Sequence, residues 1–148
     1  MTHHFETRLT WRGATRSYEQ YTRHWTVDIS GKPSLFGSAD PHFRGDHTRH
    51  NPEELFLAAL SSCHCLTYLA LCARRGVTVL AYEDCAEAAM TTQFDRVVLR
   101  PRVTISNAAH SALAAALHDD ASQHCFLARS VRCSIAHDVS ILVSTGET

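Results

Sequence analysis

The sequence has no run of like charges and no cluster of basic residues of the kind that binds nucleic acid. Its 14 Lys and Arg residues are nearly balanced by 15 Asp and Glu residues, so the formal net charge is −1. Internal repeats, linkers and low-complexity segments are also absent from the 148 residues. This length suits one domain with a substantial core, and we expect a single globular domain over residues 1–148.

The first residues, MTHHFETRLTW, lack the apolar core of a signal peptide. We therefore expect a cytoplasmic protein, because six cysteines without such a peptide indicate a reducing compartment. A disulfide framework of the secreted kind is not expected there. The thiols are then free, bound to a metal or catalytic.

Charged side chains are missing from one long stretch, residues 55–73, and both ends of that stretch carry helix signals. Asn51 suits the N-cap, Pro52 suits the first helical position and Glu54 can complete a capping box. Gly76 can take the left-handed conformation that ends a helix. A helix that is apolar on every side is normally buried on every side. The stretch is long enough to cross a membrane, but its Ser, His, Thr and Tyr residues favour a buried central helix.

Apolar residues alternate with polar ones on both sides of this helix, as they do in half-buried strands. A second, alanine-rich helix is expected from residue 106 or 107 to about residue 124. Strands followed by a helix, two strands, a helix and a strand indicate an α+β fold. The expected strands cover residues 5–11, 25–29 and 35–36, which form an antiparallel meander, and residues 77–89, 97–105 and 131–143.

One small sheet covers only one side of a helix, so an all-apolar central helix needs cover from elsewhere. A second copy of the chain would supply that cover. We therefore expect a homodimer with an extensive, core-like interface.

Half of the six cysteines have a simple packing interpretation, because a free cysteine in an apolar pattern behaves as a small hydrophobic residue. This interpretation applies to Cys72, Cys85 and Cys133. Cys63 and Cys65 lie about 200° apart around a helix, so the sequence CHC is a poor chelate. No metal site is expected there. The histidines of the loop before the helix also lack a zinc-type cysteine pair; they are His42, His47 and His50.

Several sequence blocks occur in an order that resembles the OsmC/Ohr family of thiol peroxidases. PEELFLAALSSC ends at Cys63, and HCFLARSV places Cys125 62 positions later. YTRHW and LFGSADPHFRGD precede the helix. The resemblance implies an OsmC-like fold, with antiparallel sheets wrapped around a long buried central helix in an intertwined homodimer. It also implies the reduction of organic hydroperoxides by two cysteines in an antioxidant, oxidative-stress role.

The resemblance assigns roles to individual residues. Cys63 matches the peroxidatic cysteine, Cys125 the resolving cysteine, and Glu53 the glutamate of the PEEL motif. Arg23 in YTRHW is the best match for the family arginine, which would stabilise the thiolate and orient the peroxide. The glycine-rich GGR pattern of the Ohr branch is absent, and Phe126 stands where many relatives have proline. Alternative candidates for the arginine are Arg44 and Arg49.

Helix geometry separates Glu53 from Cys63 by about 15 Å and about 80°. Glu53 is therefore expected to reach the site across a dimer contact, or through a bridging arginine. The residues expected to form apolar walls for the substrate are Leu55, Phe56, Leu60 and Phe126, with Leu127 beside them.

The resemblance implies no cofactor, and a small dithiol or a lipoyl-type protein as reductant. Neither nucleic acid nor a membrane is an expected partner. The alternative is an OsmC-fold stress protein that binds a ligand or a metal without turnover, since fold alone does not decide function.

Overall fold

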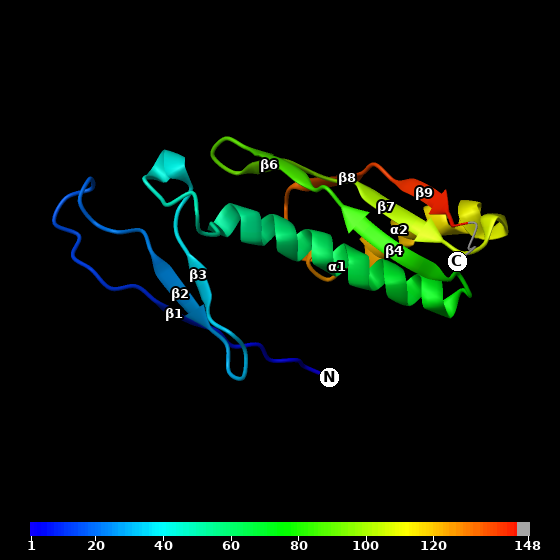
Figure 1. Ribbon diagram of the computed structural model, residues 1–148, viewed down its shortest axis with the longest axis horizontal. Coiled ribbons are helices and arrows are strands. Elements are labelled where there is room, and N and C mark those ends of the chain that lie inside the picture. The colour runs from blue at the N-terminus through cyan, green and yellow to red at the C-terminus, as the bar shows by residue number, and fades with distance from the viewer. Residues whose placement is uncertain (145–148) are drawn as a thin grey trace. The chain divides into compact units, whose positions relative to one another are not determined.

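The computed structural model describes residues 1–144, so the last four residues of the expected domain lie outside it. The chain divides into two compact units at Phe56 and Leu57, and each unit is described by itself. Figure 1 labels the helices and strands.

The N-terminal unit is built on a three-stranded antiparallel sheet in the order β1-β2-β3. Val27, in the central strand, pairs with Leu9 on one side and with Leu35 on the other. This arrangement confirms the predicted meander. The elements are β1 (Arg8–Thr10), β2 (Trp25–Asp28), β3 (Leu35–Gly37) and the short 3₁₀ helix η1 (Pro41–Phe43).

The long helix α1 (Pro52–Arg74) has the predicted ends. The Asn51 side chain accepts a hydrogen bond from the Glu54 backbone N–H at 2.8 Å, and the Glu54 carboxylate accepts one from the Asn51 N–H at 3.2 Å. These two bonds form a reciprocal capping box. Gly76 has a φ of +73°, the left-handed conformation that suits glycine after a helix.

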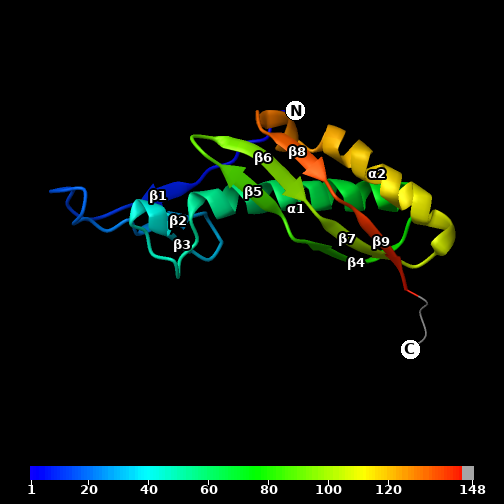
Figure 2. The ribbon, with the colours of Figure 1, turned by 90° about the horizontal axis from the view of Figure 1, so that it is seen from above.

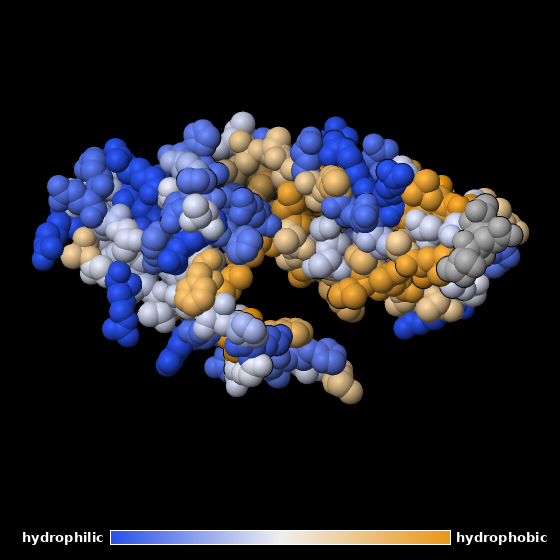
Figure 3. Space-filling model, in the orientation of Figure 1, coloured by the Kyte–Doolittle hydropathy of each residue, from blue (hydrophilic) through white to orange (hydrophobic). Residues whose placement is uncertain are grey.

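Burial of α1 was expected on all sides only with a second copy of the chain, and the single chain buries part of the helix. Within the single chain only one stripe is buried, at four-residue spacing: Leu60, His64, Tyr68 and Cys72. The opposite side is exposed at Ala58, Ser62, Leu66 and Ala70, and Figure 3 shows apolar surface along this helix. The sheets and the second helix of the single chain thus cover one face of α1 only, as expected for one chain, and burial of the opposite face by a second copy stays a prediction. By length and composition α1 also qualifies as a membrane span, as the core helices of soluble proteins do.

The C-terminal unit contains two three-stranded sheets, which follow one another along α1 (Figures 1 and 2). Each of the three long strands predicted here is two strands instead, one in each sheet. The breaks fall at residues 85–86, at Arg100 and at residues 138–139. The Asp84 carboxylate accepts a hydrogen bond from the Arg100 N–H at 2.6 Å, which ties two of the breaks together. The strands are β4 (Val79–Asp84), β5 (Glu87–Met90), β6 (Phe94–Leu99), β7 (Pro101–Ile105), β8 (Ser134–His137) and β9 (Ser140–Val143).

The sheets are mixed, which corrects the expectation of antiparallel sheets. β4 pairs antiparallel with β7 and β5 with β6, but β6 pairs parallel with β8 and β7 with β9. A parallel pair needs a crossover connection, and helix α2 (Ser111–His124) supplies it between β7 and β9. Two 3₁₀ turns flank α2: η2 (Ala108–His110), which Asn107 caps, and η3 (Ala128–Ser130).

The core of the C-terminal unit lies where α1 and α2 meet the sheet β4-β7-β9. Tyr68 and Cys72 from α1 pack with Leu117 and Ala121 from α2, and Val103 of β7 packs against them. Cys72 therefore packs as predicted. Cys85 does not, because the strand break leaves it exposed.

Candidate active site

Two of the predicted site residues meet between the helices of the C-terminal unit. Cys63 is half-buried on α1, and Cys125 is fully buried at the residue after α2. Their sulfur atoms lie 2.8 Å apart as free thiols, with the Cys125 S–H donating to Cys63 Sγ. The backbone N–H of Ala128 approaches Cys125 Sγ at 3.5 Å. A two-electron oxidant could close this pair into a disulfide with little movement.

The end of α2 sets the position of Cys125. Its backbone N–H still donates to the Ala121 carbonyl at 2.9 Å, but its φ and ψ of −69° and 116° are extended, so the helix stops there. The pKa of the Cys125 thiol is raised, first by burial and then by its hydrogen bond to Cys63. Cys125 therefore holds its proton, and Cys63 is the acceptor in the pair.

Glu53 belongs to the N-terminal unit, where its carboxylate is incompletely satisfied. Its Oε2 atom is buried and has no hydrogen-bond partner among the described residues. A buried carboxylate oxygen without a partner is costly. A hydrogen-bond donor or a cation that reached this atom would therefore be stabilising.

Arg23, also in the N-terminal unit, is held by the chain that precedes it. Its guanidinium donates to the carbonyls of Tyr21, at 2.6 Å, and Tyr18, and it lies over the Tyr21 ring at 3.7 Å from the ring centre. The two alternative arginines also lie on aromatic rings: Arg44 is 5.8 Å from the ring centre of Tyr18, and Arg49 is 5.9 Å from that of Phe36.

A pocket with aromatic walls adjoins Arg23, and it was not anticipated from the sequence. It has a volume of about 380 Å³, and its walls are Trp11, Thr15, Tyr21, Arg23, Trp25, Ser38, Ala39 and Pro52. Trp11 and Trp25 are fixed by hydrogen bonds from their indole N–H groups to the carbonyls of Thr22 and Ser38. The signal in the sequence was the pair of tryptophans on either side of YTRH, Trp11 ten residues before it and Trp25 directly after it.

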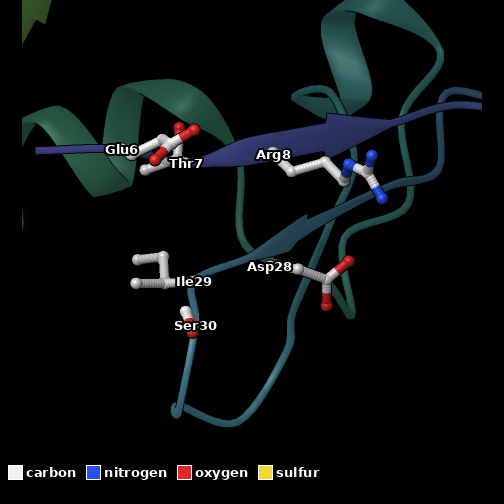
Figure 4. A pocket seen from close by; sticks show the side chains of 6 residues that line it. All are labelled: Glu6, Thr7, Arg8, Asp28, Ile29 and Ser30. Atoms are coloured by element: carbon white, nitrogen blue, oxygen red, sulfur yellow. The ribbon is translucent and has the colours of Figure 1, made fainter.

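A second pocket of the N-terminal unit is more polar and has no such aromatic walls. Figure 4 shows it between β1 and β2, with Arg8 and Asp28 extending from neighbouring strands. No predicted site residue lines it, so it is not part of the candidate site.

The residues expected to line the substrate have different exposures. Leu55 and Phe56 are half-buried in the N-terminal unit. Leu60 is only 2% exposed and belongs to the buried stripe of α1, so it offers no free surface in the single chain. Phe126 is 78% exposed beside Cys125, and Leu127 is partly exposed.

A buried histidine cluster lies next to the cysteine pair in the sequence and was missed. His64 and His118 are each 1% exposed, and His64 Nε2 lies 2.9 Å from His118 Nδ1. His137 of β8 tilts over His64, with the ring centres 4.4 Å apart. Within residues 1–144, no group of three or more His, Cys, Asp or Glu side chains has the arrangement of a metal site. The spacing of His118 and Cys125, seven residues apart on one face of a helix, could have revealed the cluster.

Cys65 is separated from the Cys63–Cys125 pair by its surroundings. Burial raises the pKa of its thiol, and the nearby Asp84 carboxylate raises it further. Asp84 in turn accepts a 2.5 Å hydrogen bond from Ser61. Cys65 therefore remains a thiol and is poorly suited to nucleophilic attack.

The fold and the site define an α+β protein with two neighbouring thiols between its helices. Comparison with known proteins identifies its family. The OsmC-like protein family matches residues 45–140. The chain therefore belongs to the OsmC-like family, within the OsmC/Ohr group that the sequence blocks resemble. No curated protein matches it.

Solved structures share the fold over nearly the whole chain. An OsmC-like protein of unknown function from Vibrio cholerae is 29% identical, with a TM-score of 0.82 over 94% of this chain and 99% of that one. An organic hydroperoxide resistance protein from Elizabethkingia anophelis is 16% identical, with a TM-score of 0.60 over 97% and 100%. An organic hydroperoxide resistance protein OsmC from Legionella pneumophila is 18% identical, with a TM-score of 0.58 over 96% and 100%. The last two identities support the fold alone.

Proposed function

We propose that this protein is a thiol-dependent peroxidase that reduces organic hydroperoxides to alcohols. The observation that carries the proposal is the 2.8 Å approach of the Cys63 and Cys125 sulfur atoms. A packing role would not require two thiols to meet across 62 positions of sequence. Membership of the OsmC/Ohr group supports the same chemistry.

In the first step, the Cys63 thiolate attacks the terminal oxygen of the hydroperoxide, R–O–O–H. The O–O bond breaks, Cys63 becomes a sulfenic acid, and the alkoxide leaves and takes a proton to become an alcohol. In the second step, Cys125 attacks the Cys63 sulfur. Hydroxide leaves and combines with the Cys125 proton as water, and a disulfide remains. An external dithiol, free or carried by a protein, then reduces that disulfide.

The pocket beside Arg23 supports an organic substrate. Aromatic walls favour an alkyl or aryl group, and a guanidinium can hold a peroxide oxygen through its planar fork. We assign the orienting role to Arg23 and the carboxylate partner of the arginine to Glu53. The Glu53 Oε2 atom has no hydrogen-bond partner among the described residues of one copy, so it can accept a hydrogen bond from an arginine of a second copy.

We further propose that the working form is an intertwined homodimer with its active site at the interface. The exposed apolar side of α1 includes Leu66, which is 69% exposed in the single chain. Within residues 1–56, the only buried residues are Gly37, Ser38 and Asn51. A three-stranded sheet with so little buried apolar surface needs cover from another layer. A second copy would supply that layer and cover α1.

The test is thiol counting by mass spectrometry before and after one equivalent of cumene hydroperoxide, on wild type, Cys63→Ser and Cys125→Ser. Wild type should gain one Cys63–Cys125 disulfide, and Cys125→Ser should stop at sulfenic or sulfinic acid on Cys63. Cys85 is the internal control, because it is exposed but has no thiol neighbour in the proposed scheme. Cumene hydroperoxide should react faster than hydrogen peroxide. Six thiols that stay reduced would leave the non-catalytic ligand-binding alternative.

A further inference from the structure

The buried pair His64 and His118 has an unusual geometry. The ring planes differ by only 12°, the ring centres are 5.3 Å apart, and the joined nitrogen atoms are 2.9 Å apart. These values place the imidazoles edge to edge in nearly one plane, joined by a single hydrogen bond. Tyr68 lies flat on the His118 ring at 3.8 Å, and its hydroxyl donates to the Ala114 carbonyl at 3.0 Å.

Burying this pair of imidazoles is a costly way to stabilise the fold, because one hydrogen bond satisfies only half of their polar nitrogens. Burial lowers the pKa of both histidines, so both rings are neutral near pH 7. Each neutral ring has one N–H and one lone pair, and the single bond uses one of each. The outer nitrogens, His64 Nδ1 and His118 Nε2, have no partner among the described residues. An apolar pair of similar volume would avoid that cost.

A hydrogen bond offers what an apolar contact does not, a defined distance and direction between two helices. His64 directly follows Cys63 on α1, and His118 lies two helical turns before Cys125 on the buried face of α2. Three contacts between α1 and α2 run in antiparallel order: Tyr68 with Ala114, His64 with His118, and Cys63 with Cys125. The imidazole pair is thus the middle contact, between the tyrosine and the thiols.

We propose that the His64–His118 hydrogen bond positions α2 against α1 so that Cys125 is held at bonding distance from Cys63. The pair thereby sets how readily the disulfide closes. His64 and His118 are positioning residues that touch neither the peroxide nor the sulfur atoms in this role. The catalytic consequence rests on the proposed function, whereas the effect on the thiol–disulfide equilibrium does not depend on it.

The first test equilibrates the reduced protein with graded ratios of reduced to oxidised glutathione, without any hydroperoxide. His118→Leu removes the hydrogen bond, whereas His118→Asn places an amide near the position of Nδ1. His64→Leu and His64→Gln are the matching pair at the other ring, because the Gln amide lies near the position of Nε2. Each Leu variant should lower the equilibrium constant for disulfide closure about tenfold, about 30 mV for a two-electron couple. The Asn and Gln variants should stay within about threefold of wild type.

The double variant His64→Leu/His118→Leu separates positioning from packing. Two leucines can pack together, so this protein should unfold at the same temperature as wild type or higher. It should still show the tenfold loss in disulfide closure. A folded double variant with the wild-type equilibrium would overturn the proposal. If a single Leu variant fails to fold, the double, Asn and Gln variants carry the test.

A single turnover with cumene hydroperoxide separates the two proposals. Formation of the Cys63 sulfenic acid should keep its wild-type rate within about twofold in the double variant, and closure of the disulfide should slow about tenfold. If wild type does not react with the hydroperoxide but the variants still shift the glutathione equilibrium as expected, the peroxidase function alone is refuted. A peroxidase whose closure rate is the same in all variants would refute the positioning role alone.

Discussion

Acid should destabilise this protein through its two buried imidazoles. Burial is the main cause that lowers the pKa of His64 to about 3, and of His118 to about 4, with His137 adding to both effects. An unfolded histidine has a pKa of about 6.5. Between these values the unfolded state binds more protons than the folded state, so the free energy of unfolding falls as pH falls.

The expected loss follows from the ordinary histidine pKa. At pH 7.5 both rings are neutral in the folded and the unfolded state. At pH 5.0 the unfolded rings are protonated and the folded rings are still neutral, which costs about 2 kcal/mol for each ring. The two rings together give about 4 kcal/mol, a large share of a typical stability of 5–15 kcal/mol. His137, whose pKa burial also lowers although Asp119 and Asp84 oppose the shift, acts in the same direction.

The assay is urea unfolding at pH 7.5 and pH 5.0, followed by far-UV circular dichroism at one protein concentration with the thiols reduced. The matched control is His64→Leu/His118→Leu, which should lose about 4 kcal/mol less than wild type over this interval. The other histidines are the same in wild type and in the double variant, so their contributions cancel in this comparison. An equal loss in wild type and the double variant would refute the reasoning.

Two further predictions concern α1. Asn51→Ala removes the side-chain half of the capping box and should lower the free energy of unfolding, measured by urea unfolding, by about 1 kcal/mol. Asn51→Asp keeps an acceptor and should stay close to wild type. Equal stabilities of the Ala and Asp variants would contradict the role of the cap. Leu66→Glu places a charge on the exposed side of α1. It should convert a dimer to monomers by light scattering and reduce peroxidase activity, whereas Leu66→Met keeps the dimer. A monomeric Leu66→Glu with full activity would show that the site needs no second copy.

Local signals in the sequence predicted much of the fold. The ends of α1 depend on bonds among residues 51, 54 and 76 and their neighbours, so Asn51, Glu54 and Gly76 were sufficient to place them. The meander and the end of α2 followed from alternation and helix propensity in the same way, but α2 begins at Ser111, because Asn107 caps the 3₁₀ turn η2 that precedes it. The family resemblance selected Cys63 and Cys125 among six cysteines, and the family comparison confirms the resemblance itself.

Among the strand breaks, only the one at Arg100 has a local signal, Pro101 directly after it, which favours an edge or a bulge. The parallel pairs have none. The break at Arg100 depends on a hydrogen bond to Asp84, 16 residues away, and β7 pairs with β9 only after α2 has crossed over. Alternating residues continue through such a break, so the pattern alone predicts one long strand. For the same reason Cys85, placed inside a strand by its pattern, lies exposed at the break.

The sequence by itself determined both ends of α1 and the end of α2, because those features rest on bonds between close neighbours in the chain. Its resemblance to a family, and not any local bond, selected Cys63 and Cys125. Only the tertiary structure decided that His64 meets His118 across 54 positions, and it shows the 2.8 Å approach of Cys63 and Cys125, which the resemblance had paired. These contacts form when α2 packs against α1, and the direction of that packing depends on the whole core. A pattern of apolar residues shows that two helices bury a face, but it does not show which side chains then touch.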